Sequence, residues 1–144
     1  MTKTYYHVTP VTHSAGVVIP RGSYLKDADT DAAYVKDDPN QEFLRERIRL
    51  KHYPEKPSRF KASFVFERLE DATFFRDNLR QGHRIYRVRF LNSCAEVHRV
   101  CYTAWKSDHH NIEQQAHDFW SSPSNYSSNS EVFAESDLVV ESEA

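Results

Sequence analysis

The first residues whose types and spacing could support chemistry lie almost at the start of the chain. Residues 5–10 read YYHVTP, and two tyrosines and a valine ahead of a proline predict a short strand that ends at Pro10. Side chains alternate along a strand, so Tyr5, His7 and Thr9 share one face. This places a titratable imidazole at the mouth of a strand. The same pattern is typical of a half-exposed edge-strand histidine, so the partners of His7 decide its role.

A second group of candidate residues is the row His109, Glu113 and His117, at spacings of four. This spacing predicts one face of a helix, and such a row can bind zinc. Metal ligands converge on a point, however, whereas these residues run along an axis. No cysteine lies close by in sequence, and Cys94 and Cys101 lack metal-motif spacing. We therefore expect a solvated polar face and no metal site.

Composition indicates one soluble domain spanning residues 1–144, with 39% apolar and 28% charged residues. No apolar run is long enough to span a membrane, and no signal peptide is evident. Two unpaired cysteines are typical of a reducing cytoplasm. A net charge of -2 argues against general affinity for nucleic acid. With three glycines, neither a P-loop nor a Gly-rich dinucleotide fingerprint can be built.

Charge is unevenly distributed along the chain. Residues 45–61 carry seven positive and two negative side chains, whereas residues 131–144 carry five negative and none positive. A basic segment of this kind can hold an anion or form a solvated helix face, and it can also meet the acidic tail in the fold. A nucleic-acid acceptor is therefore worth testing through the salt dependence of binding.

The elements that position these residues follow from periodicity. Helices are expected over 41–51, 70–80 and 108–120, and strands over 60–69, 84–91 and 95–100. The apolar pieces 132–134 and 138–140 predict a closing strand or a bent pair. Strands outnumber helices in the second half, so the predicted fold class is α+β.

Three short motifs are arranged in a recognisable order. In residues 6–9 (YHVT), a histidine near the end of a strand is followed by Val8 and Thr9. Phe64 and Phe75, with ten residues between them, lie on a strand and the helix after it. Residues 130–133 (SEVF) place Glu131 at the start of a late strand. On these motifs the chain resembles the ADP-ribosyltransferase superfamily, on the diphtheria-toxin and poly-ADP-ribose polymerase side.

The resemblance implies a split β-sandwich of two mostly antiparallel sheets with flanking helices, and it implies NAD as co-substrate. His7 would hydrogen-bond the ribose on the adenosine side of NAD, and Thr9 completes this cofactor-binding motif. The backbone of Val8 would hold the nicotinamide amide. Phe64 and Phe75 would enclose the nicotinamide ring. Glu131 would bind the nicotinamide ribose and stabilise its cationic form as nicotinamide leaves.

Two details depart from the family pattern, and two others stay open. The aromatic pair is usually tyrosine, so hydroxyl contacts are absent here, and Val8 stands where glycine is frequent. Glu135 is an alternative to Glu131 as the functional carboxylate. From its position ahead of the aromatic strand, Arg59 is expected either to bind the pyrophosphate of NAD or to be a plain surface arginine.

The expected function is that of a mono-ADP-ribosyltransferase that releases nicotinamide and passes ADP-ribose to a protein or nucleic-acid acceptor. Small size suggests a bacterial or phage toxin or effector by family analogy, with an antitoxin or inhibitor protein as a partner. The alternatives are an NAD glycohydrolase and a non-catalytic module that binds ADP-ribose, nucleic acid or a protein.

Overall fold

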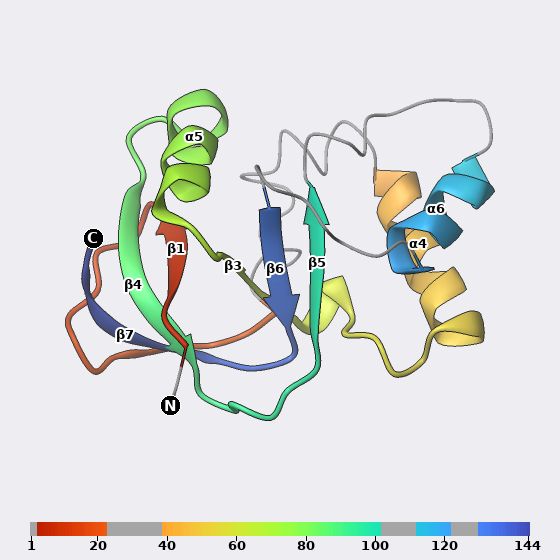
Figure 1. Cartoon of the computed structure of the whole chain (residues 1–144), viewed down its shortest axis with the longest axis horizontal. Coiled ribbons are helices and arrows are strands. Elements are labelled where there is room, and N and C mark those ends of the chain that lie inside the picture. Colours follow the sequence, from red (N-terminus) through yellow and green to blue (C-terminus); the bar gives the residue numbers. More distant parts are fainter. Residues whose placement is uncertain (1–2, 23–38, 102–111, 122–129) are drawn as a thin grey trace.

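The computed structural model describes residues 3–22, 39–101, 112–121 and 130–144, and this part of the chain has an α+β fold (Figure 1). The strands are β1 (Tyr5–Thr9), β2 (Val18–Ile19), β3 (Ser63–Phe66), β4 (Arg84–Phe90), β5 (Val97–Cys101), β6 (Ser130–Ala134) and β7 (Leu138–Glu143). The helices are α4 (Pro39–His52), α5 (Leu69–Leu79), α6 (Ile112–Ser121) and the short 3-10 helix η1 (Arg59–Lys61). No helix within these ranges is long and apolar enough to cross a membrane.

All seven strands belong to one antiparallel sheet, in the order β2-β7-β4-β1-β3-β6-β5. This corrects the expectation of two separate sheets. The connection between β1 and β3 is nevertheless minimal, because it consists of a single residue pair, Tyr6 with Phe66. By contrast, β1 pairs with β4 through five residues and β3 pairs with β6 through four. We call strands β2, β7, β4 and β1 the β1 half, and strands β3, β6 and β5 the β6 half.

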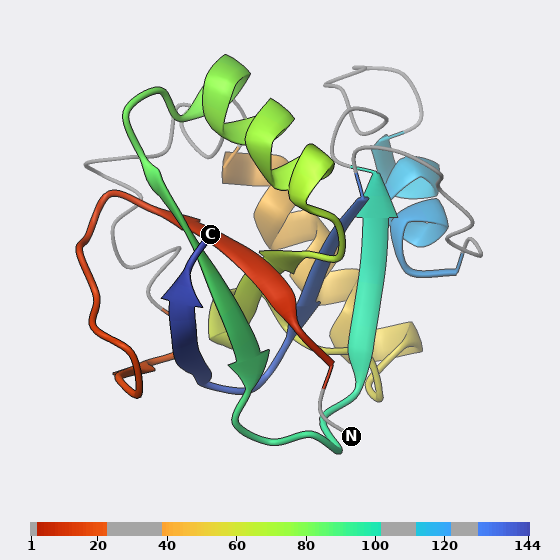
Figure 2. The ribbon, with the colours of Figure 1, turned by 60° about the vertical axis from the view of Figure 1, so that its left-hand side comes forward.

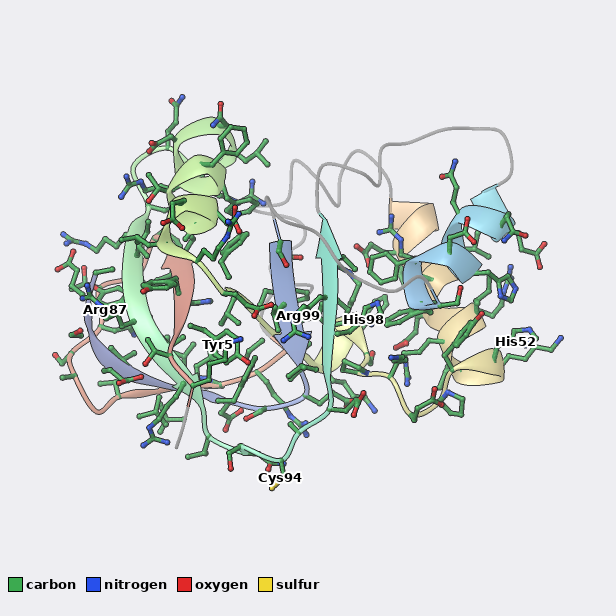
Figure 3. The ribbon with its side chains drawn as sticks, in the orientation of Figure 1. Tyr5, His52, Arg87, Cys94, His98 and Arg99 are labelled. Atoms are coloured by element: carbon green, nitrogen blue, oxygen red, sulfur yellow. The ribbon has the colours of Figure 1, made fainter. Side chains whose placement is uncertain are left out.

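The two halves share one apolar core. Figure 2 shows β1 and β6 running in clearly different directions, so the sheet is strongly bent where the halves meet. Tyr5 lies between the halves in Figure 3, and its ring centroid is 5.0 Å from that of Phe90. Buried residues from both halves form this core, namely Tyr5, Val65, Tyr86, Val88, Phe90, Val132, Ala134, Leu138 and Val140. The bend thus produces, within a single sheet, the burial that a sandwich of two sheets would give.

Helices cover the opposite faces of the two halves. Helix α5 packs on the β1–β3 connection, where Ala72 joins Phe66 and Ile85 in a second cluster. Helices α4 and α6 lie side by side beyond β5 and β6 (Figure 1). Apolar side chains of these helices pack against the outer face of the β6 half. The buried members of this cluster are Ile48, Ala62, Val100, Ala116, Phe119, Trp120 and Phe133. The indole N–H of Trp120 donates to the carbonyl of Arg45 at 2.9 Å, which ties α6 to α4.

Most differences from the predicted boundaries have local causes. The strand expected over 60–69 begins only at Ser63, because Ser58 caps η1 by accepting a hydrogen bond from the Phe60 N–H at 3.2 Å. The closing pieces form a bent pair of strands that lie in different halves of the sheet. β2 was not among the predicted strands, and it forms by pairing with β7. Residues 108–111 of the last predicted helix lie outside the described residues.

Candidate active site

His7, Phe64 and Glu131 lie on three strands around the connection between the two halves, namely β1, β3 and β6. In the sheet register, Tyr6 pairs with Phe66 and Phe66 pairs with Glu131. One row of residues therefore crosses the connection. Because neighbouring strands are about 4.8 Å apart, the backbones of Tyr6 and Glu131 are separated by roughly 10 Å. This distance is short enough for one extended ligand to reach all three elements.

The His7 side chain lies where β1 and β3 part. Its Nδ1 is 2.8 Å from the carbonyl oxygen of Phe64, and the ring is half-buried. A carbonyl only accepts, so Nδ1 carries the hydrogen and Nε2 is the acceptor. Burial lowers the pKa of His7, the hydrogen bond to Phe64 opposes that shift, and nearby His13 lowers the pKa further. The imidazole is therefore neutral near pH 7, with a defined tautomer.

Glu131 is a buried carboxylate, 5% exposed, at the start of β6. Its Oε1 lies 3.5 Å from Nη1 of Arg59. Within the described residues this oxygen makes an ion pair but no hydrogen bond of good geometry. Burial raises the pKa of Glu131, the charge of Arg59 opposes the shift, and the charge of Glu42 adds to it. The pKa of a carboxyl in this setting is set by its neighbours, as is common at functional sites.

Arg59 is inside the protein, 3% exposed, and not on its surface. Its Nε is 3.0 Å from both carboxylate oxygens of Glu42. Its guanidinium carbon is 4.9 Å from the ring centroid of Phe64 and 5.2 Å from that of Phe133. The surface-arginine alternative is therefore wrong. The pyrophosphate role stays a prediction, and the charged partners observed for Arg59 are carboxylates.

The two aromatics of the second motif lie in different surroundings. Phe64 packs against Phe133, with ring centroids 5.4 Å apart. Phe75 lies on α5 and packs against Phe66, with ring centroids 5.1 Å apart. The guanidinium carbon of Arg80 is 5.4 Å from the ring centroid of Phe75. Both rings are half-buried. Phe64 is thus grouped with Arg59, while Phe75 is grouped with Arg80.

The remaining predicted positions lie around this centre. Val8 is half-buried beside the α5 cluster. Thr9 is buried, and its hydroxyl accepts from the Val11 N–H at 3.2 Å, which closes the turn after β1. Glu135 lies beyond the other end of β6, where its Oε2 accepts from the Ser58 N–H at 3.3 Å. Glu131 therefore shares the sheet row with Tyr6, whereas Glu135 does not.

Sequence reasoning missed Glu42, the closest acidic partner of Arg59. Glu42 lies in the first turn of α4, where an acidic residue is typical of an ordinary helix start. Its only distinguishing signal was its place beside the apolar stripe of the helix. Of the candidate zinc row, His109 is outside the described residues, Glu113 is exposed, and the ring of His117 contacts the Tyr53 hydroxyl at 3.2 Å. Within the described ranges, no three His, Cys, Asp or Glu side chains could hold a metal.

Comparison with known proteins gives one family. A search of curated proteins gives no match. Residues 23–142 match a family described as "Protein of unknown function (DUF2441)". The match takes in every described element from α4 to β7, and it ends within β7. The chain therefore belongs to the DUF2441 family.

Proposed function

We propose that this protein is an NAD-dependent mono-ADP-ribosyltransferase that releases nicotinamide and transfers ADP-ribose to a macromolecular acceptor. The observation that supports the proposal is that His7, Phe64 and Glu131 lie on three neighbouring strands where the sheet divides, and that Nδ1 of His7 is 2.8 Å from the Phe64 carbonyl oxygen. Successive members of this set are 57 and 67 positions apart in the sequence. The finer description of the fold as an ADP-ribosyltransferase-like split sandwich is part of this proposal, and the single-pair connection between the halves supports it.

Glu131 is the proposed catalytic residue. The bond between the ribose C1′ and the nicotinamide nitrogen breaks, and its electron pair stays with the ring, so neutral nicotinamide leaves. The sugar develops oxocarbenium character, which a fixed carboxylate stabilises. The acceptor then bonds to C1′ and gives up a proton. Glu131 must be ionised for this role, and the adjacent Arg59 favours its ionised form.

The groups around Glu131 would orient NAD. With Nδ1 of His7 committed to the Phe64 carbonyl, Nε2 is an acceptor for a ribose hydroxyl. Phe64 presents a half-buried ring backed by the Arg59 guanidinium, a surface suited to a flat nicotinamide. Val8 would contribute its backbone N–H and carbonyl, and Phe75 would bound the site on the α5 side.

Activity, cofactor and acceptor can be tested together. The protein is incubated with labelled NAD, with and without cell lysate, and nicotinamide release and label in protein and nucleic-acid fractions are measured. Release with lysate-dependent labelling supports transfer, and release without labelling supports NAD hydrolysis instead. No release under either condition refutes both enzyme readings and leaves a binding module. A cytoplasmic toxin or effector role, with an inhibitor partner, rests on family analogy.

Two matched variants identify the carboxylate. Glu131→Gln removes the charge but keeps the shape, so we expect nicotinamide release to fall by about 100-fold or more while NAD still binds. Glu135→Gln, just beyond the other end of β6, is the control, and we expect it to retain activity. The opposite pattern would show that Glu135 is the functional group.

A further inference from the structure

Helix α4 brings two charged side chains to the centre that holds Glu131. Glu42 is 4% exposed and Arg45 is 6% exposed, and their side chains are 3.3 Å apart. Glu42 also contacts Arg59, which in turn contacts Glu131. Two carboxylates and two guanidinium groups are thus buried together. Such a cluster is stable only while each charge keeps its partner, so the positions of its members depend on one another.

The sharing of Arg59 between the two carboxylates is unequal. Nε of Arg59 lies 3.0 Å from both oxygens of Glu42, a close charge-assisted contact. The nearest printed contact with Glu131 is 3.5 Å, between Nη1 and Oε1. Glu42 therefore has the stronger hold on the guanidinium. Any loosening of Glu42 would weaken its competition with Glu131 for Arg59.

Aromatic rings restrict where the Arg59 guanidinium can go. Its carbon is 4.9 Å, 5.2 Å and 5.5 Å from the ring centroids of Phe64, Phe133 and Phe119. Arg45 is likewise 4.7 Å from the ring of Phe119. Rings of this kind attract the cations and exclude water, which strengthens the electrostatic coupling inside the cluster. The Arg59 guanidinium is thus held among aromatic rings and away from solvent, within reach of both carboxylates.

We propose that Glu42 is a positioning residue for Glu131. The two carboxylates compete for Arg59, so the contact between Glu42 and Arg59 controls how firmly Arg59 holds the catalytic carboxylate of Glu131. This inference rests on the proposed function, because it takes Glu131 as the carboxylate that meets the substrate. It gives α4 a role in the activity although the helix contributes no group that contacts NAD. Movement of α4 would change the environment of Glu131 through Arg59.

Several other charged groups face this cluster and belong in any account of its pH dependence. They are Asp71 on α5, Arg80 just after that helix, His98 on β5, and Lys56, whose charge acts on His98. Arg80 acts on Glu131 with the same sign as Arg59. Neither Arg80 nor Asp71 is altered in the experiment below, so their contribution stays constant.

The first test does not require enzymatic activity. The Glu131 carboxyl is titrated by NMR in protein with ¹³C-labelled glutamate, and Glu131→Gln assigns its signal. Removing the negative charge of Glu42 in Glu42→Gln is expected to lower the Glu131 pKa by about one unit. Glu46→Gln is the matched control, one turn along α4. Glu46 pairs with Arg49 and accepts from the Ser58 hydroxyl, and glutamine keeps an acceptor oxygen for Ser58. We expect Glu46→Gln to leave the Glu131 titration unchanged.

A conservative variant guards against misfolding. Glu42→Asp keeps the charge but withdraws it by one methylene group, so a smaller shift in the same direction is expected. An unchanged Glu131 pKa in a folded Glu42 variant overturns the proposal. So does an equal shift in Glu46→Gln, because that result would indicate a general effect of α4.

The second test uses the proposed activity. In Glu42→Gln the acid limb of nicotinamide release should move to lower pH by about the same one unit. A merely structural role would lower the rate at all pH values without moving the limb. If the wild-type protein releases no nicotinamide while the Glu131 titration shifts as expected, the proposed function fails and the coupling stands. If release is normal but neither titration nor limb moves, the coupling fails alone.

Discussion

Replacing Arg59 by methionine removes the cation that two buried carboxylates share. Arg59 is 3% exposed, and both Glu42 and Glu131 are nearly as buried. Breaking a buried ion pair from one side leaves charge uncompensated and costs about 3–5 kcal/mol of unfolding free energy. Methionine keeps most of the volume, so the cost arises from charge and not from a cavity. We expect a loss of this size at pH 7.5.

The loss should depend on pH, and the sign follows from Glu131. Its pKa in the folded protein is already raised by burial, and removal of Arg59 raises it further. The folded variant then binds a proton that the unfolded chain, with a glutamate pKa of about 4.3, does not. The stability of the variant relative to wild type therefore falls as pH rises through this window. It recovers as pH falls through the same window and is fully recovered below the unfolded value.

Urea unfolding followed by circular dichroism at pH 7.5 and pH 5.0 measures both effects. Arg76→Met is the control, because Arg76 forms a surface pair with Asp77 and should cost about 0–1 kcal/mol. Should Arg59→Met fail to fold, the double variant with Glu131→Gln removes one of the stranded charges and is expected to recover part of the stability. A loss below about 1 kcal/mol at pH 7.5, or the same loss at both pH values, would show that the buried charges are not coupled through Arg59.

Two further outcomes concern the histidines. His98 lies on β5 facing α4 and α6 (Figure 3), donates to the Phe119 carbonyl at 2.7 Å, and has its pKa lowered by burial to about 4. Below the unfolded value of about 6.5 the unfolded chain binds the extra proton, so stability should fall by about 1.4 kcal/mol per pH unit down to pH 4. His98→Gln should flatten this slope in urea titrations, and an unchanged slope would assign it to other groups. For His7, substitution by alanine should weaken NAD binding in calorimetry by about tenfold, the value of one or two lost hydrogen bonds. An unchanged dissociation constant removes His7 from the site.

Local patterns predicted the elements well where side-chain periodicity is strong. The alternating apolar residues of 60–69 and 84–91 correspond to β3 and β4, and the stripe of 41–51 corresponds to α4. Period-two and helical patterns depend on which face a residue buries, and this information lies within a few neighbouring positions. β2 escaped prediction because two residues carry no period, and it forms only by pairing with β7.

The candidate site was predicted in part. The motifs around His7 and Glu131 were identified from the order of residue types along the chain. The partner of Arg59 was not, because an arginine ahead of a strand looks the same whether it faces a phosphate, solvent or a carboxylate. Glu42 lies 17 positions away, on a helix whose first turn would accept an acidic residue in any case. The burial of both groups is a property of how α4 packs on the sheet.

By itself, the sequence determined an α+β fold class, most of the helices and strands, and a short set of candidate residues for the proposed site. Tertiary structure decided that the strands form one bent sheet, whose two halves are paired through Tyr6 and Phe66 in the described part of the chain. It also decided that Arg59 is shared by Glu42 and Glu131. The physical reason is the range of the interactions. Backbone pairing and side-chain periodicity leave local traces, whereas buried charge pairing depends on which distant surfaces exclude water together.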